Sequence, residues 1–387
     1  MNFELTDEQQ MIYEYGKNVS QKYDRKYWME HAERKEFTLD LWRQVGQDGF
    51  LGMMVDENYG GAGQGMFEMA LLMEGMANEG IPLLMLVVGP TMSLSHISAH
   101  GTEEQKQFYL PDACKGDKIF CFAITEPNAG TNTMKISTVA KPKGDKFVLN
   151  GTKTFISGAD VADYALVVAR TTPHDQVERK TDGFTLFVVD MKAKGVDKHL
   201  IPVSVSMPDT QWTLFFDDVE LGPENVIGEV GKGFELLFDS LNPERIIVAT
   251  MCTGLGRYAL DKAVAYASER KVFNGPIGAY QGVQHPLAMA KTEIELASLM
   301  ARKAAWCFDN KDPDEGAAAN MAKYAAAEAA IHAVDAAVQA HGGNGFTKEY
   351  GIFDIFPVVR LMRTAPLNRE IILSYIAQYV MGLPRSY

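Results

Sequence analysis

Between Ile119 and about Gly228, apolar residues recur at every second position, whereas on either side of this stretch they recur three and four positions apart. Alternation is the period of a half-buried β-strand, and a spacing of three and four is that of an amphipathic helix. No long helical pattern interrupts the middle stretch, which argues against a doubly wound α/β sheet. The sequence therefore predicts an α+β chain, with an antiparallel sheet or barrel between two helical zones.

The composition is ordinary for a globular protein of two or three domains: 387 residues, of which 22% are charged. The formal net charge of −13 and the lack of a basic patch argue against nucleic-acid binding. The chain starts without the basic and apolar regions of a secretory signal, and no apolar run is long enough to span a membrane. The four cysteines form no CxxC pair, so we expect reduced thiols and a cytoplasmic protein.

Some patterns that could bind a ligand are weak. The glycine-rich stretches YGGAGQG and GEVGKGFE lack the Gly-Lys-Ser/Thr of a phosphate loop and follow no buried parallel strand. His96 and His100 are four positions apart, a spacing that places both on one helix face. Because no third ligand accompanies them, we expect no metal site.

Two segments of the strand zone offer groups for a flat polar ligand. In ITEPNAGT, from Ile124 to Thr131, a strand ends in a turn whose free backbone amides could bind a polar cofactor edge. In NGTKTFISGA, Phe155 and Ser157 would point to the same face of a strand. A ring and a hydroxyl on one face could stack on a heterocycle and hydrogen-bond it. An ordinary strand-end turn and a half-exposed strand remain the alternatives.

The stretch SLNPERIIVAT places a carboxylate, Glu244, directly after Asn242 and Pro243. Asn is a preferred N-cap and Pro a preferred first helical residue, so a helix is expected to begin here. The helix dipole favours an acidic residue at this place and lowers its pKa. Burial against Ile246 and Ile247 would raise the pKa instead. Glu244 is therefore either a solvated charge at a helix start or a base.

These motifs together resemble the acyl-CoA dehydrogenase family. The resemblance covers nearly the whole chain and rests on ITEPNAGT, LNGTKTFIS, FDDVELGPENVIGEVGKGF, SERKVFNGPIGAYQ and QAHGGNGF, in the family's order. It implies an N-terminal α-helical domain at 1–118, a middle antiparallel β-barrel domain at 119–228 and a C-terminal four-helix bundle at 229–387.

The resemblance also implies an activity. Members bind FAD and oxidise an acyl-CoA thioester to its trans-2-enoyl form, as part of fatty-acid or acyl-CoA catabolism. They pass the electrons to an electron-transfer flavoprotein, and most are homotetramers built as dimers of dimers.

Site residues follow from the same resemblance. The residues expected to line the flavin are Phe122, Ile124, Thr125, Phe155 and Ser157. Those expected to hold the FAD diphosphate and adenosine, some of them across a dimer interface, are Arg270, Phe273, Gln281, Gln339, Gly342 and Gly343. Those expected to contact CoA are Thr131, Asn242 and Arg245. Val272 departs from the pattern, because many members have a hydroxyl residue at this position.

The position of the catalytic base is where the chain departs most from the family pattern. Many members use a Glu in a Tyr-Glu-Gly-Thr segment near the C-terminus, where this chain has Pro366 in an ungapped register or Ile372 in a gapped one, which we prefer. Neither is a carboxylate, and Glu370 is only a neighbour. A smaller branch, which includes enzymes resembling isovaleryl-CoA dehydrogenase, carries the base on the helix that here contains LNPERI, and Glu244 matches that position.

The C-terminal register also affects how the substrate carbonyl would be polarised. In family members a backbone N–H at the base position helps to bind it; Pro366 has no N–H, whereas Ile372 has one. The altered segment suggests a branched, cyclic or otherwise unusual acyl group. Two alternatives stay open: a reductase working in the opposite direction, and a non-catalytic member that acts as a partner subunit of a heteromeric acyl-CoA dehydrogenase or as an acyl-CoA-binding protein.

Overall fold

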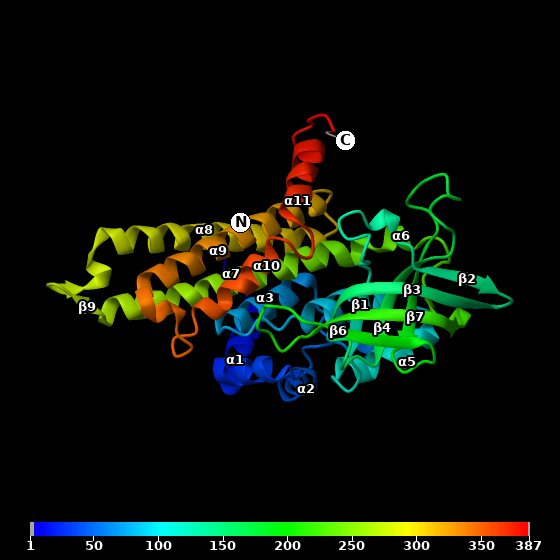
Figure 1. Cartoon of the computed structure of the whole chain (residues 1–387), viewed down its shortest axis with the longest axis horizontal. Helices are drawn as coiled ribbons and strands as arrows, with labels where there is room; N and C mark the ends of the chain where they lie inside the picture. Colours follow the sequence, from blue (N-terminus) through cyan, green and yellow to red (C-terminus); the bar gives the residue numbers. More distant parts are fainter. Residues whose placement is uncertain (1–3, 386–387) are drawn as a thin grey trace.

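The computed structural model describes residues 4–385, and helices, strands and helices follow one another along the chain (Figure 1). The α-helices before the sheet are α1 (Asp7–Arg34), α2 (Leu39–Gln47), α3 (Met66–Asn78), α4 (Ser95–His100) and α5 (Glu103–Cys114). A π-helical stretch, Val87–Leu94, precedes α4. The predicted capping box at the start of α1 is confirmed, because the side chains of Thr6 and Gln9 each accept from the other's backbone N–H.

The strands that follow are β1 (Phe120–Ala123), β2 (Val139–Lys143), β3 (Lys146–Ser157), β4 (Tyr164–Arg170), β5 (Phe184–Asp190), β6 (Val196–Ile201), β7 (Gln211–Leu221) and β8 (Val226–Ile227). They form one sheet in the order β6-β7-β3-β2-β4-β5-β8, and β1 joins it by pairing with β4. The sheet is mostly antiparallel, but β1 pairs with β4 in parallel, and so does β2 at one residue pair. The prediction of an antiparallel sheet therefore needs this correction.

Helices return after the sheet: α6 (Gly233–Leu236), α7 (Phe238–Glu269), α8 (Gln281–Asp309), α9 (Glu315–His341), α10 (Phe356–Met362) and α11 (Arg369–Tyr375). A short hairpin of β9 (Lys271–Val272) and β10 (Gly275–Pro276) joins α7 to the α8 region. The domain boundaries at 118/119 and 228/229 stay a prediction; both fall in links between elements of different type. None of the helices in residues 4–385 is long and apolar enough to cross a bilayer.

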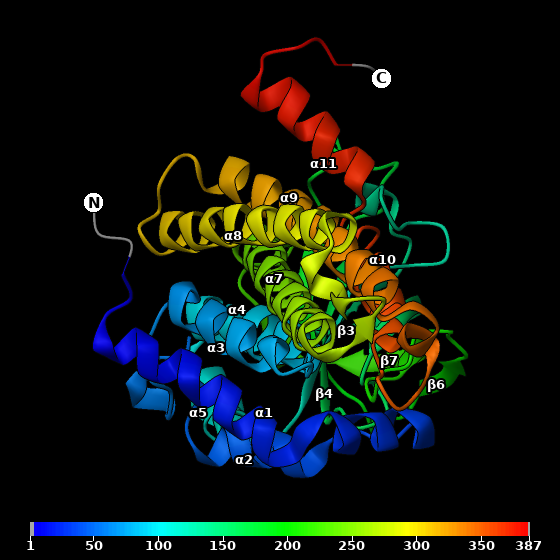
Figure 2. The same ribbon diagram turned by 90° about the vertical axis from the view of Figure 1, so that its left-hand side faces the viewer.

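The helices are stacked in layers beside the sheet. Figure 2 shows α1 and α2 on one side, then α3 and α4, then α7, with α8 and α9 on the opposite side. The sheet lies at one end of these layers and the β9–β10 hairpin at the other (Figure 1). In both views α11 points away from the body of the molecule. One hydrophobic core joins the helices to one side of the sheet, and a second lies within the strand region.

The helix that carries Glu244 begins earlier than the sequence predicts. Leu237 is already in helical conformation and connects α6 directly to α7, so Pro243 lies inside α7 and Asn242 is not its N-cap. The expected helix start at Asn242 is therefore wrong. As a result Glu244 lies in the second turn of α7. The helix dipole acts most strongly on the first turn, so its effect on Glu244 is smaller than expected.

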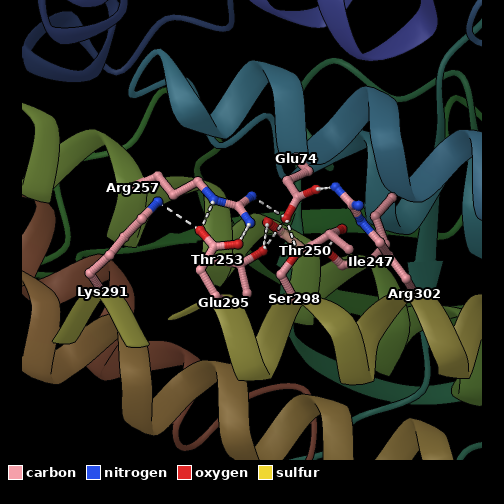
Figure 3. Close-up of polar contacts among 9 residues, drawn as sticks. All are labelled: Glu74, Ile247, Thr250, Thr253, Arg257, Lys291, Glu295, Ser298 and Arg302. Atoms are coloured by element: carbon pink, nitrogen blue, oxygen red, sulfur yellow. Dashed lines mark hydrogen bonds and ion pairs between the residues drawn. The ribbon is translucent and has the colours of Figure 1, made fainter. Parts of the chain in front are cut away.

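A buried carboxylate joins α3 to α7 and α8. Glu74 is 1% exposed and accepts hydrogen bonds from Thr253 at 2.8 Å and from Ser298 at 2.8 Å. It also pairs with Arg257 at 2.6 Å and with Arg302 at 3.3 Å (Figure 3). Burial raises the pKa of Glu74, but the two guanidinium groups and the two hydroxyls outweigh it and hold the pKa below its usual value.

This polar cluster lies where two helices approach very closely. An added Cβ on Gly254 of α7 would come within 2.6 Å of the Ala77 Cβ and 2.7 Å of the Glu74 carbonyl oxygen of α3. At such a close crossing, any residue larger than glycine would force the helices apart. Glu74 therefore holds α7 against α3 at a point where the two helices are too close for a larger side chain between them.

We predict that Glu74→Gln lowers the free energy of unfolding by about 3–5 kcal/mol, since it removes the charge of the buried carboxylate that pairs with Arg257 and Arg302. The matched control is Glu295→Gln. Glu295 pairs with the same Arg257 at 3.1 Å but is 47% exposed, so its loss should cost about 1 kcal/mol or less. Urea unfolding of the three proteins makes the comparison, and equal losses would contradict it.

Candidate functional site

The two segments predicted to face a flat ligand lie side by side. The Thr154 amide of β3 donates to the Thr125 carbonyl oxygen at 2.9 Å, just after the end of β1. The Lys153 ammonium donates to the Ile124 carbonyl oxygen, also at 2.9 Å. Phe122 is buried in β1, whereas Ile124 and Thr125 are partly exposed. The structure thus brings together the residues that the sequence could only list as two separate motifs.

A buried ion pair holds these two segments in place. Lys153 is 0% exposed and pairs with Glu126 at 2.9 Å. Glu126 also accepts from the amides of Ser137 and Thr138, at 2.6 and 2.9 Å. Burial lowers the pKa of Lys153 to about 8, although Glu126 opposes this. Because each partner would be costly to bury alone, the pair resists any movement of ITEPNAGT away from β3.

Phe155 and Ser157 do not follow the simple strand alternation that the sequence predicts. The pairing of β3 with β7 shifts between Lys153 and Ile156, which marks a bulge. Phe155 lies in this bulge with φ of 57° and is 59% exposed. Such a backbone conformation is unusual for an aromatic residue and persists only where its surroundings enforce it. The bulge turns the Phe155 ring toward the surface, and Ser157 hydrogen-bonds the Gln211 side chain.

A second group of predicted residues meets in one pocket at the far end of the helices. Arg270, Gln339, Gly342 and Gly343 line a pocket of about 340 Å³. Among the described residues, none pairs with the Arg270 guanidinium through an ion pair or side-chain hydrogen bond. An added Cβ on either glycine would meet nothing within 4 Å, so their backbone is open to the pocket. An unpaired cation beside open backbone suits the negative diphosphate of a dinucleotide.

Two predicted FAD residues lie outside this pocket. Phe273 lies in the turn of the β9–β10 hairpin and is 93% exposed, with φ of 56°. Gln281 is exposed at the first position of α8. Within one chain these side chains face solvent, so they could contact a ligand bound to another copy of the chain.

The flavin segments and the Arg270 pocket lie at opposite ends of α7 (Figure 1). Glu244 is in the second turn of α7, and Arg270 directly follows its last residue. The two are 26 residues apart, about 39 Å at a rise of 1.5 Å per residue. The two groups of predicted residues therefore lie far apart within one chain.

Glu244 is a partly buried residue of α7. None of the described residues hydrogen-bonds its carboxylate, while Arg245 and Lys323 act on it as nearby positive charges. Desolvation raises the pKa of Glu244 to about 7, against the lowering effect of these two cations. A carboxyl group that titrates near neutral pH is a typical general base.

The predicted CoA contacts are engaged with other residues of the chain. Asn242 is buried, donates to Glu315 at 2.6 Å and accepts from Arg245 at 2.6 Å. Thr131 is exposed and accepts from Asn368 at 2.7 Å. That last bond ties the turn after β1 to the C-terminal segment, so both lie at the Glu244 end of the molecule.

The C-terminal segment supplies no carboxylate and no free amide at either candidate position. Pro366 has no N–H, and the Ile372 N–H already donates to the Asn368 carbonyl oxygen at 3.2 Å inside α11. The expectation that Ile372 offers a free donor is therefore wrong, because α11 begins at Arg369 and takes up this amide. Glu370, the rival base, is exposed at the start of α11.

Sequence reasoning missed the residues of α9 that hold this segment. Lys323 is 1% exposed and donates to the Leu367 carbonyl oxygen at 2.6 Å. Glu328 pairs with Arg363 at 2.5 Å and with Arg369 at 3.7 Å. A signal was available, because Lys323 lies on the alanine face that α9 buries. A lysine in such a place needs a partner.

The two histidines singled out in the sequence make no metal site. His100 pairs with Asp239 at 2.8 Å, and the His96 ring lies edge-on to it, with centroids 5.4 Å apart. Within residues 4–385, no group of three or more His, Cys, Asp or Glu side chains could hold a metal ion.

Comparison with known proteins identifies the fold and the family. Models of the acyl-CoA dehydrogenase N-terminal, middle and C-terminal domains match residues 6–117, 121–219 and 231–381. The acyl-CoA dehydrogenase FadE12 of Mycobacterium tuberculosis is 46% identical over 94% of both chains. The caffeyl-CoA reductase-Etf complex subunit CarC of Acetobacterium woodii is 34% identical over 84% of both chains. The butyryl-CoA dehydrogenase of Megasphaera elsdenii superposes with a TM-score of 0.93 at 28% identity, covering 98% of this chain and 100% of that one.

The order of helical, strand and helical zones fits these matches. The N-terminal helical domain, the β middle domain and the helical C-terminal domain of the family are all present. The chain belongs to the acyl-CoA dehydrogenase family and is an FAD-dependent acyl-CoA dehydrogenase.

Proposed function

We propose that Glu244 is the catalytic base that removes a proton from C2 of an acyl-CoA thioester. The observation that carries the proposal is the burial of its carboxylate, which raises the pKa of Glu244 to about 7. At neutral pH such a group is partly ionised and still basic enough to accept a proton. Glu370, the nearest carboxylate in the C-terminal segment, is exposed and lacks this environment.

The roles proposed for the other residues follow from the resemblance to the family. Bound FAD supplies the hydride acceptor. Phe122, Ile124, Thr125, Phe155 and Ser157 line the flavin, and the bulge of β3 presents the exposed Phe155 ring to it. The protein's part is to hold the thioester against the flavin, to exclude water and to receive the proton at the Glu244 carboxylate. Thr131, Asn242 and Arg245 contact CoA near that end of α7.

We propose that FAD is shared between two copies of the chain. Arg270, Gln339, Gly342 and Gly343 of one copy, with Phe273 and Gln281, hold the diphosphate and adenosine of the FAD whose flavin lies in the other copy. The length of α7 between Glu244 and Arg270 supports this arrangement. The exposed apolar residues of α8 suit further contacts in a homotetramer: Met289, Leu296, Leu299 and Trp306.

The acyl group is branched, cyclic or otherwise unusual, and an electron-transfer flavoprotein accepts the electrons. The link from α10 to α11, which lacks the usual Glu-Gly-Thr, supports the first statement. The relative in a caffeyl-CoA reductase-Etf complex supports the second. That relative is named as a reductase, so the reverse direction is a second candidate, tested by oxidation of the reduced flavin with enoyl-CoA thioesters. The named relatives are a dehydrogenase and a reductase subunit, which favours catalysis over a purely binding role.

We predict that Glu244→Gln slows reduction of the flavin by acyl-CoA about 10²–10⁴-fold, the usual contribution of a general base. Anaerobic stopped-flow bleaching with a panel of acyl-CoA thioesters measures the rate. The matched control is Glu370→Gln in α11, which should react at the rate of the unmodified enzyme. A Glu244→Gln enzyme that bleaches as fast as the unmodified one would show that Glu244 is not the base.

We predict that Glu126→Gln weakens FAD binding about tenfold or more, ~1.4 kcal/mol, because it breaks the buried pair that fixes both flavin segments. The control is Glu220→Gln. Glu220 of β7 pairs with Lys143 and Lys146 at 3.6 and 3.5 Å in the same sheet, but it is 58% exposed. FAD release on dilution, followed by flavin fluorescence, compares the variants, and equal retention would overturn the role given to Glu126.

The shared cofactor predicts that two inactive variants restore each other. Glu244→Gln lacks the base, and Arg270→Glu repels the diphosphate. After co-refolding of the two with FAD, a mixed pair of subunits has one site with an intact Glu244 and an intact Arg270. With random mixing, half of the pairs are mixed and one of the two sites in each is intact, so about a quarter of all sites should be active. If FAD were bound within a single chain, every site would keep a defect, and the mixture would stay inactive.

A further inference from the structure

Asn368 makes two different hydrogen bonds at the start of α11, the helix that points away from the body of the molecule (Figure 2). Its side-chain oxygen accepts from the Ile371 amide at 2.9 Å and so caps the helix. Its side-chain NH2 group donates to the Thr131 hydroxyl oxygen at 2.7 Å. An asparagine side chain carries one acceptor oxygen and one donor group, so it can make both bonds at once. Asn368 thus links α11 to the turn after β1.

The C-terminal side of this link is firmly held. Lys323 of α9, which is 1% exposed, donates to the carbonyl oxygen of Leu367, the residue directly before Asn368. Glu328 of α9 pairs at 3.7 Å with Arg369, the residue directly after it. The Asn368 side chain therefore extends from a backbone whose position is fixed by α9.

The Thr131 side of the link has fewer contacts. Thr131 is exposed, and among the described residues its bond with Asn368 is the one hydrogen bond that it makes. The preceding residue is Gly130, where an added Cβ would meet nothing within 4 Å. The turn is therefore open around Thr131, and the hydroxyl takes its position from Asn368.

The direction of the bond decides what Thr131 can offer to a ligand. A hydroxyl group has one hydrogen to donate and two lone pairs that accept. Because the Thr131 oxygen accepts from the Asn368 side chain, its own hydrogen stays free for a further acceptor. The phosphate oxygens and amide carbonyl oxygens of CoA are such acceptors. Asn368 thus presents the Thr131 hydroxyl as a donor.

We propose that Asn368 is a positioning residue for CoA, because it fixes the Thr131 hydroxyl as a hydrogen-bond donor to an acceptor oxygen of the CoA moiety. This inference rests on the proposed contact of Thr131 with CoA. Asn368 does not have to touch CoA, since it acts through Thr131. The CoA contact of a turn in the strand region then depends on a residue of the C-terminal segment.

We predict that Asn368→Asp raises the Kd of acetyl-CoA about five- to tenfold, as expected for the loss of one hydrogen bond. Aspartate caps a helix as well as asparagine does, so α11 should be kept. A carboxylate only accepts, so the Thr131 hydroxyl would donate its hydrogen to it instead of to CoA. Acetyl-CoA carries the whole CoA moiety but has no C3 to oxidise. Isothermal titration calorimetry with the FAD-loaded enzyme therefore measures binding without turnover.

The new carboxylate also adds a negative charge, which by itself would weaken the binding of CoA. Thr131→Val separates the two effects, because it removes the hydroxyl and keeps a similar shape. Alone, it should raise the Kd by a similar factor, and in its background Asn368→Asp should add little. If Asn368→Asp raised the Kd by the same factor with and without the hydroxyl, Asn368 would act independently of Thr131 and the proposal would be overturned.

Turnover gives a second readout. With the acyl-CoA that reduces the flavin fastest, Asn368→Asp should raise KM by a similar factor and leave kcat nearly unchanged. The reason is that the contact with CoA is the same in the ground state and in the transition state. A lowered kcat with an unchanged KM would show that Asn368 only shapes the C-terminal segment, and it would overturn the proposal.

The two single variants also distinguish this inference from the CoA contact on which it rests. A raised Kd in Thr131→Val with an unchanged Kd in Asn368→Asp would refute the inference and leave the contact of Thr131 with CoA intact. An unchanged Kd in Thr131→Val would refute that contact, and the inference with it. Neither result bears on Glu244 as the base, because binding of acetyl-CoA needs no proton transfer.

Discussion

Burial of the Glu244 carboxylate costs free energy, and the positive charges near it offset part of this cost. No hydrogen-bond donor among the described residues satisfies the carboxylate, so its charged form depends on Arg245 and Lys323. The balance leaves the pKa of Glu244 at about 7. Fewer cations would leave the group protonated at neutral pH, and more would make it too weak a base. The pKa of Glu244 therefore depends on its burial and on these two cations.

The position of Glu244 depends on α7, one continuous helix. The Glu74 cluster fixes the middle of α7 against α3 and α8, while the ends of α7 carry Glu244 and the Arg270 pocket. Because one continuous helix separates the two ends by about 39 Å, the spacing between Glu244 and the Arg270 pocket cannot adjust within one chain. A cofactor shared between subunits is the consequence that we propose.

The zones of helix and strand could be predicted because hydrophobic periodicity survives in a single sequence, and the family motifs marked most of the candidate residues. Local rules failed where tertiary contacts overrode them. Asn242 and Pro243 look like a helix start, but α6 leads straight into α7 and Asn242 instead bonds Glu315. Strand alternation failed at Phe155, because a bulge cannot be read from residue types. Lys323 was missed, because its partner Leu367 is 44 residues away.

Exchange of the C2 hydrogen tests the central claim most directly, because it isolates proton transfer from flavin chemistry. Phenylacetyl-CoA has acidic C2 hydrogens and no hydrogen on C3 to transfer, so in D₂O it can only exchange. Mass spectrometry would follow deuterium uptake with the unmodified enzyme and with Glu244→Gln across the pH range. The account predicts uptake that rises through a midpoint near pH 7 and is lost in Glu244→Gln. Equal uptake by both enzymes would contradict it.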